Sequence, residues 1–367
     1  MDIAEREILI WLSSLGIGNS NIDKITNSFK DLREFWEAPN DEVYSINNIK
    51  KEVKEKLVYY KNKENIKKLF YNIEKQNINI LTIYDENYPK RLRYIDDSPK
   101  VLYAKGNILQ EDSLGIAIVG SRKATAYGKW ACEKFTKELV NLGITIISGL
   151  ALGIDAIAHK TALDNGGRTI GVIGNGIDII YPKKNLHLYK DVEEQGCVVS
   201  EFPLGTPPLA YNFPQRNRII SGLSLGVVVI EAQEKSGSLI TAHHGLEQGK
   251  DIFALPGNIN SIFSSGTNKL IKDGAKPLLE IDDIIEEIHQ IQDKLSSQKK
   301  HSKREIDYSN YSETEIRLIK ILETEPMHSD TISYKLGIDI ATLNSILTIL
   351  ELKGVVKELS SRVFTIC

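Results

Sequence analysis

The chain has 367 residues, 41% of them hydrophobic and 26% charged, and its net charge at pH 7 is −3. This composition is typical of a folded globular protein and excludes a fibrous or disordered chain. Three scattered cysteines provide neither a disulfide framework nor a CxxC metal site, which favours a reducing compartment. The sequence starts without a signal-peptide pattern and contains no apolar stretch of membrane-spanning length, so we expect a cytoplasmic protein without a membrane partner.

Residues 1–60 predict a small helical domain. Apolar residues recur at helical spacing between Ile8 and Trp36, and the turn Gly16-Ile17-Gly18 interrupts them. Such a turn can present backbone amides to a DNA phosphate, as in a helix-hairpin-helix. The alternative is a SAM-like helical interaction domain, and it is favoured because a single Gly-x-Gly turn is a common feature.

Residues 61–290 predict a Rossmann-like domain with an N-terminal extension that includes a strand at 78–84. Continuous runs of apolar residues, rather than alternating ones, are typical of strands buried on both faces. Helical patterns separate the runs, so we expect an α/β fold with a doubly wound, parallel sheet of about six strands. The six runs are 115–119, 144–147, 169–173, 197–200, 226–230 and 251–255.

Residues 291–307 are polar and basic and predict a linker, and residues 308–367 predict a winged-helix domain. Ser312 and Glu315 have the spacing of a capping box, and three helical patterns precede a hairpin at 354–366. The expected recognition helix carries no Lys or Arg before Lys353, which argues against tight reading of duplex DNA.

Five strand-to-loop junctions between Val119 and Ser238 end in small or basic polar residues. In a parallel sheet these junctions share one edge, where ligands bind and helix N-termini offer N–H groups to phosphates. We therefore predict a large anionic ligand at this edge. The candidate binding residues are Gly120, Ser121, Arg122, Gly149, Lys183, Asn185, Phe213, Arg216, Asn217, Arg218, Ser236, Gly237 and Ser238.

Arginine dominates the predicted contacts. Gly120 and Ser121 allow a close approach of the backbone to a phosphate, and Arg122 adds a charge-assisted contact; the alternative is a tight turn with an exposed arginine. Arg216 and Arg218 are two residues apart, so in an extended segment they would share a side and clamp adjacent phosphates. The alternative for these two arginines is an ion pair at a helix start, with Glu201 or Glu231 as partner.

The other candidates have structural alternatives as well. Phe213 is either a stacking platform for a base or a core residue. Lys183 either lines the groove or is a solvated surface charge. Asp155 and His159 lie four residues apart and are expected to order the loop at 148–153. Because the sequence contains no recognisable catalytic triad or metal-ligand spacing, we expect no catalytic residues, no metal and no cofactor.

From Gly115 to about Leu279 the sequence resembles the DNA-processing protein A family, also known as DprA or Smf. The resemblance implies a non-enzymatic, single-stranded DNA-binding protein that protects incoming DNA and helps to load the recombinase RecA during natural transformation. It also implies a homodimer formed through the α/β domain, near the 251–275 end. The matching stretches occur in order at 118–122, 148–155, 181–182, 213–220, 236–238 and 255–257.

The rival hypothesis is a nucleotide-processing hydrolase of the phosphoribohydrolase type, similar to the proteins that resemble lysine decarboxylases. Such enzymes would use a Gly-rich loop followed by a catalytic glutamate in the pattern Pro-Gly-Gly-x-Gly-Thr-x-x-Glu. Here the corresponding loop is 236–238, and the first glutamate after it is Glu247, which is too distant for that pattern.

Overall fold

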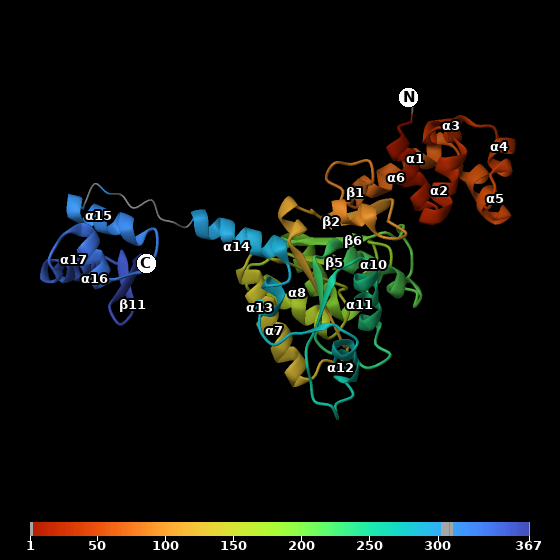
Figure 1. The fold of residues 1–367 in the computed structure, drawn as a ribbon. Coiled ribbons are helices and arrows are strands. Elements are labelled where there is room, and N and C mark those ends of the chain that lie inside the picture. Colours follow the sequence, from red (N-terminus) through yellow and green to blue (C-terminus); the bar gives the residue numbers. More distant parts are fainter. Residues whose placement is uncertain (1–2, 302–307, 309–310, 367) are drawn as a thin grey trace. The chain divides into compact units, whose positions relative to one another are not determined.

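The structure is a computed structural model that describes residues 3–301, 308 and 311–366. The chain forms two compact units, Met1–Ser296 and Ser297–Cys367, which are described separately (Figure 1). In the described part of the chain, no helix has the length and apolar character needed to cross a bilayer.

The first unit is built on a nine-stranded sheet with the order β1-β2-β6-β5-β4-β3-β7-β8-β9. Neighbouring strands from β6 to β9 along this order are parallel, which confirms the predicted doubly wound α/β fold. The chain runs outward from β3 to β6 and then returns to place β7 on the other side of β3, so the topological switch point lies between β3 and β7. The six predicted strands are β3 (Gly115–Val119), β4 (Thr145–Ser148), β5 (Thr169–Val172), β6 (Cys197–Ser200), β7 (Gly226–Val229) and β8 (Asp251–Ala254).

Three further strands extend the sheet. β1 (Asn79–Thr82) lies within the predicted strand at 78–84, and it pairs antiparallel with β2 (Val101–Gly106), which the sequence did not indicate. β2 pairs antiparallel with β6, and the short β9 (Lys276–Pro277) adds to β8. The N-terminal extension therefore completes one side of the parallel sheet.

Helices cover both faces of the sheet (Figure 1). One face packs against α7 (Ala126–Asn141), α8 (Ile154–Asp164) and α13 (Asp282–Ile285), and the other packs against α10 (Asn212–Leu223) and α11 (Gly237–Glu247). Apolar strand residues face both layers, because the parallel strands are buried on both sides. The remaining elements of this region are η1 (Lys90–Tyr94), η2 (Gln110–Ser113), η3 (Lys183–Asn185), α9 (Leu186–Gln195) and α12 (Ser265–Lys272).

The predicted N-terminal helices are present, but they continue to Lys75, beyond the predicted bound at residue 60, and they pack against the sheet domain. Trp11 and Phe35 are fully buried and share one apolar core with Tyr103 of β2 and Val192 of α9. The rings of Trp11 and Trp36 meet edge to face with their centroids 5.0 Å apart. The helices are α1 (Glu5–Ser14), α2 (Asn19–Ser28), α3 (Leu32–Glu37), α4 (Asn40–Ser45), α5 (Lys51–Tyr60) and α6 (Lys63–Lys75).

The segment predicted as a linker, 291–307, is helical over its first part. α14 (His289–His301) begins before it, and Ile291 and Leu295 pack into the core formed by α7 and α13. Two apolar residues one turn apart thus continue the helical periodicity that the polar composition concealed. Residues 302–307 lie outside the described residues.

The second unit is a winged helix, as predicted. Its three-stranded sheet has the order β10-β12-β11, and Ser312 and Glu315 form the predicted capping box at the start of the first helix. One core joins the three helices and the hairpin, and it contains Leu318, Ile332, Leu343 and Phe364. The elements are α15 (Glu313–Leu322), β10 (Met327–His328), α16 (Ser329–Leu336), α17 (Ile340–Leu352), β11 (Val356–Ser360) and β12 (Val363–Ile366).

Candidate nucleic-acid interface

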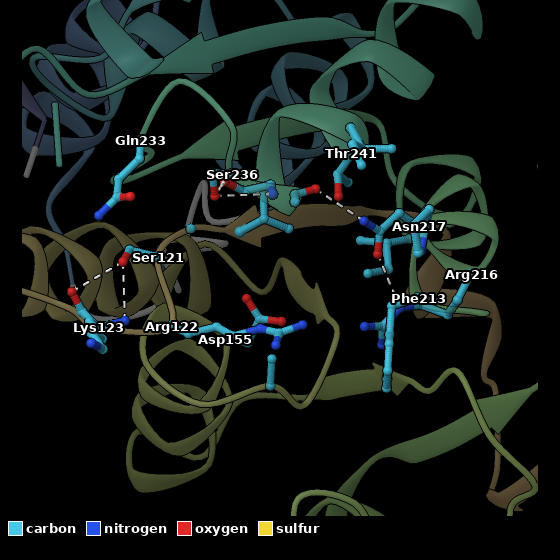
Figure 2. Close-up of a pocket in the computed structure, with 18 of the residues that line it drawn as sticks. Ser121, Arg122, Lys123, Asp155, Phe213, Arg216, Asn217, Gln233, Ser236 and Thr241 are labelled. Atoms are coloured by element: carbon cyan, nitrogen blue, oxygen red, sulfur yellow. Dashed lines mark hydrogen bonds between the residues drawn. The ribbon is translucent and has the colours of Figure 1, made fainter. Parts of the chain in front are cut away.

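A pocket of about 630 Å³ lies at the topological switch point, beyond the carboxyl ends of the parallel strands. The loops that follow β3, β4 and β7 line it, together with the first turns of α10 and α11. Figure 2 shows these segments facing one another across the pocket. Ligands of open α/β sheets bind at this position because the flanking loops diverge there. We refer to it below as the switch-point pocket.

The loop after β3 brings two exposed cations to the pocket. A Cβ atom on Gly120 would lie 2.7 Å from Cγ1 of Ile154, so glycine lets this loop pack tightly against α8. The Ser121 hydroxyl accepts a hydrogen bond from the Lys123 N–H and donates one to the Lys123 carbonyl, each 3.1 Å long. The turn is thereby held, and the side chains of Arg122 and Lys123 remain exposed.

The N-terminus of α11 faces this loop. Ser236 is its N-cap and accepts a hydrogen bond from the Ser238 N–H, and the two hydroxyls lie 2.8 Å apart. Gly237 is exposed, and no atom lies within 4 Å of the place where its Cβ would be. Asn217 on α10 donates to the Gly237 carbonyl over 3.2 Å and so fixes the position of the turn. A helix N-terminus with an open approach attracts anions.

An aromatic cluster forms another wall of the pocket. The Phe213 ring is half-buried, and the guanidinium of Arg122 lies 5.9 Å from its centroid. The exposed ring of Tyr181 lies 5.7 Å from the Phe213 ring, with an interplanar angle of 32°. Figure 2 shows the Arg122 side chain extending toward Phe213. A planar group entering the pocket would therefore meet an aromatic face beside a guanidinium.

Arg216 is a buried part of the pocket floor. It donates hydrogen bonds to the carbonyl of Gly149 over 2.7 Å and to the carbonyl of Val172, and its Nε bonds the side chain of Asn217 over 3.1 Å. Burial lowers the pKa of Arg216 to about 10 while the nearby Asp155 opposes the shift, so the guanidinium stays charged at neutral pH. Arg216 thus supports the adjacent loop and contributes positive potential beneath the pocket.

The loop after β4 is held by side chains on every side. Asp155 accepts from the Gly149 N–H over 3.1 Å, and His159 accepts from the Leu150 N–H over 3.3 Å. Asn185 donates to the Leu150 carbonyl over 2.8 Å. Leu150 has φ of 53°, a conformation that L residues adopt at a cost, and these contacts hold it there. The predicted structural role of Asp155 and His159 is confirmed.

The expected geometry of Arg216 and Arg218 was wrong. The segment is helical from Asn212, so two residues rotate the side chain by about 200° and separate the two arginines. Arg218 donates to Glu201 over 2.6 Å and to Asp97 over 3.2 Å, outside the pocket lining. The alternative of an ion pair with Glu201 is therefore correct for Arg218, although the pair lies in the middle of α10 rather than at its start, and Arg216 bonds backbone carbonyls instead.

Glu231, the other acid weighed as a partner for these arginines, binds Thr125, the N-cap residue of α7, instead. It accepts from the N–H of Thr125 over 3.0 Å and from its hydroxyl over 2.5 Å. Its negative charge thus lies at the positive end of the α7 dipole.

The structure brings most of the predicted residues together and leaves four aside. Gly149, Lys183, Asn185 and Arg218 do not line the pocket, and of these Asn185 and Arg218 are occupied by intramolecular contacts. The pocket contains Gly120, Ser121, Arg122, Phe213, Arg216, Asn217, Ser236, Gly237 and Ser238.

Sequence reasoning left some lining residues out of the site. Tyr181 and Gln233 line the pocket but were not among the candidates. The aromatic residue of the Tyr181-Pro182 pair, in the loop after β5, was the available signal for Tyr181. Gln233 follows β7 without a motif of its own, and only the sheet order brings it to the pocket.

Comparisons with known proteins agree with this architecture. The family model described as DNA recombination-mediator protein A matches residues 79–289, and the DprA winged helix domain matches residues 307–361. DNA processing protein DprA from Bacillus subtilis is 47% identical over 214 residues, which span 58% of this chain and 72% of that protein. The chain belongs to the DNA recombination-mediator protein A family, which is the DprA/Smf family that the sequence motifs indicated.

Two solved structures share the fold. DprA from Streptococcus pneumoniae aligns with a TM-score of 0.68 and 37% identity, covering 78% of this chain and 99% of that one. DprA from Helicobacter pylori, described for its single-stranded DNA binding mode, aligns with a TM-score of 0.53 and 33% identity over 60% of this chain and 96% of that one.

Proposed function

We propose that this protein binds single-stranded DNA in the switch-point pocket. The observation that carries the proposal is the pairing of the exposed Arg122 and Lys123 with the open N-terminus of α11 on opposite sides of one pocket. Both are suited to phosphate groups, the first through charge and the second through free backbone N–H groups. Neither reads base identity, so we expect binding that is largely independent of sequence.

The aromatic wall favours single-stranded over duplex DNA. Phe213 and Tyr181 can stack only on a base whose face is free, and the faces of duplex bases are already covered by their neighbours. Support comes from the Helicobacter pylori relative, whose structure is described for its single-stranded DNA binding mode. Lys183 remains a proposed outer contact, because it is exposed on η3.

We further propose that the bound DNA is protected and passed to the recombinase RecA during natural transformation. Membership of the DNA recombination-mediator protein A family supports this role. We also propose a homodimer formed through the loop between β8 and α12. Ile259 and Ile262 lie in this loop with exposed fractions of 94% and 64%, and exposed apolar residues of this kind are typical of contact surfaces.

The contacts of the acidic side chains support a non-enzymatic role. Asp155 is the one carboxylate among the described residues that line the pocket, and it is buried and bonded to the Gly149 N–H. Glu231 is engaged by the N–H and the hydroxyl of Thr125, the N-cap residue of α7. Glu247, the first glutamate after the 236–238 loop, ends α11 about 15 Å from its N-terminus and contacts His243 and His244.

The test is a binding titration with single-stranded DNA, duplex DNA and RNA oligonucleotides over a range of salt concentrations. We expect preference for single-stranded DNA and an affinity that falls with salt in proportion to the number of phosphate contacts. A parallel incubation with nucleoside monophosphates should release no free base. Released base together with weak DNA binding would replace the proposal with the phosphoribohydrolase hypothesis.

A further inference from the structure

One face of α7 presents two exposed aromatic rings beside the switch-point pocket. Tyr127 and Trp130 have exposed fractions of 45% and 56%, and their rings are stacked with centroids 6.0 Å apart and an interplanar angle of 25°. Exposed apolar side chains that lie next to one another, rather than singly, are typical of binding surfaces. This pair is not needed for the core, because the buried face of α7 is formed by other residues, such as Phe135 and Leu139.

Lysines continue the same face. Lys134 and Lys137 follow Trp130 at helical spacing, so Tyr127, Trp130, Lys134 and Lys137 form one stripe, which we call the α7 face. The Lys134 ammonium lies 5.9 Å from the Trp130 ring. It also lies 4.9 Å from the Phe135 ring, and the Lys134 side chain is half-buried, whereas Lys137 is exposed. Among the described residues neither lysine forms an ion pair within 4 Å.

Acidic residues flank this face rather than occupy it. Glu133 lies to one side and contacts Lys129 at 3.7 Å, which offsets both of those charges. Glu138 lies at the other edge and is half-buried. The centre of the face therefore combines aromatic surface with two lysines, whose acidic neighbours one helical turn away, Glu133 and Glu138, lie at its edges.

The α7 face starts at the sheet edge that carries the pocket. The Tyr127 hydroxyl donates over 3.0 Å to the carbonyl of Pro256, which lies in the loop after β8. Lys123, which lines the pocket, lies four residues before Tyr127. From Tyr127 to Lys137 the face is about 15 Å long, at 1.5 Å of helix per residue. Four residues span at most about 14 Å, so one DNA strand could contact both Lys123 and the start of this face.

We propose that the α7 face binds the part of a single-stranded DNA that extends beyond the switch-point pocket, with bases stacked on Trp130 and Tyr127 and phosphates near Lys134 and Lys137. The inference rests on the proposed function and assigns it a second, adjoining contact surface. Aromatic platforms interleaved with cations are the arrangement that binds single strands without sequence preference. A protein partner fits less well, because lysine is depleted from protein–protein interfaces.

The experiment compares two oligo-dT lengths in the full-length protein, one of about five nucleotides and one of about fifteen. The variants are Trp130→Ala, Trp130→Phe, Arg122→Ala and, as a matched control, Tyr59→Ala. Tyr59 is an exposed aromatic residue on α5, with an exposed fraction of 76%, and it does not line the pocket. Circular dichroism and thermal melting verify that each variant is folded.

We expect Trp130→Ala to weaken binding of the longer oligonucleotide about fivefold or more and to leave the shorter one unchanged, because loss of a stacking platform affects only DNA that reaches it. Trp130→Phe should retain most of the affinity, and Tyr59→Ala should match the wild type. Binding of the longer oligonucleotide should also quench tryptophan fluorescence. Trp130 is 56% exposed, whereas Trp11 is 1% exposed and Trp36 is half-buried against it, and the quenching should disappear in Trp130→Phe.

Two failures can be told apart. If Arg122→Ala loses affinity but Trp130→Ala binds both lengths like the wild type, the α7 face is not part of the DNA path, and a protein partner becomes its better occupant. If the wild-type protein binds neither oligonucleotide, the proposed function itself is wrong.

Discussion

Arg218 donates a hydrogen bond of 2.6 Å from Nη2 to Oε2 of Glu201, and both side chains are almost completely buried. Burial raises the pKa of Glu201, and the Arg218 charge opposes that shift. Asp97 accepts a second hydrogen bond from the same Nη2 atom over 3.2 Å, and its carbonyl contacts Asn19 on α2. This arginine therefore connects α10 to β6 and to the segment that meets the N-terminal helices.

Arg218→Ala should destabilise the protein rather than weaken DNA binding. Removing one partner of a buried pair leaves the other charge uncompensated, which typically costs about 3–5 kcal/mol of the free energy of unfolding. Urea denaturation measures that loss, and oligo-dT affinity below the unfolding range should equal the wild-type value. The double variant Arg218→Met with Glu201→Leu removes both charges and should recover much of the stability. A stable Arg218→Ala protein with weak DNA binding would place Arg218 in the binding site.

Arg122→Ala should weaken DNA binding without destabilising the protein. Arg122 is exposed and forms no ion pair among the described residues, so its removal should leave thermal melting unchanged. Loss of a charge-assisted phosphate contact should lower single-strand affinity about tenfold or more and reduce the log–log salt slope by about 0.7. The control is Lys67→Ala, which removes the same charge at an exposed position on α6. Wild-type affinity and an unchanged salt slope in folded Arg122→Ala would exclude the switch-point pocket.

His159 should make stability depend on pH. Burial lowers its pKa from 6.5 to about 3, and the charge of Arg216 adds to that shift. Between these values the unfolded chain binds a proton that the folded protein does not, so the free energy of unfolding falls as the pH drops below 6.5. At pH 5 the expected loss is about 2 kcal/mol relative to pH 7.

The measurement compares urea denaturation of the wild type and His159→Gln across pH 7 to about 4.5. Glutamine stays neutral and can still accept a hydrogen bond from the Leu150 N–H. The unfolding free energy of the variant should therefore change less steeply with pH, by the equivalent of up to one bound proton. Buried acids such as Asp155 contribute to both curves and cancel in the difference. Parallel curves would show that His159 does not stay neutral in the folded protein.

Removing the second compact unit should have little effect on DNA binding in the switch-point pocket. The first unit ends at Ser296, and Ile291 and Leu295 belong to its core, so a truncation should start at residue 297. The recognition helix α17 contains no Lys or Arg within Ile340–Leu352, so it lacks the cations that bind phosphates. We expect single-strand affinity within several-fold of the full-length value. A 100-fold loss in a folded truncation would move the main site to the winged helix.

Self-association should depend on the loop between β8 and α12. Sedimentation at micromolar concentration should show a species heavier than the 41.2 kDa monomer. Replacing the exposed Ile259 and Ile262 by Asp should shift it to the monomer, because charged residues are disfavoured in the centre of an interface. Tyr94→Asp, at an equally exposed apolar position in η1, is the control. A wild-type protein that sediments only as a monomer would contradict the proposed dimer.

Much of the fold could be predicted from local patterns. The six parallel strands coincide with the continuous, mainly apolar runs, and the capping box at Ser312 marks the start of α15 correctly. β2 escaped notice because its apolar run stands alone, without the alternation of helix and strand that identified the others. α14 escaped notice because its polar composition outweighs the two apolar residues that hold it to the core.

The site, too, could be predicted in part from the sequence. The sequence by itself determined which loops meet at the sheet edge, because parallel strands place all their carboxyl ends on one side, and it therefore predicted Arg122, Phe213 and Ser236 together. Only the tertiary structure decided which arginines are free. Arg216 and Arg218 differ from Arg122 through partners such as Gly149 and Glu201, which lie 67 and 17 residues away in the chain. Whether a charged side chain is buried depends on such partners, which are distant in the chain. The sequence alone does not show how close they come in space.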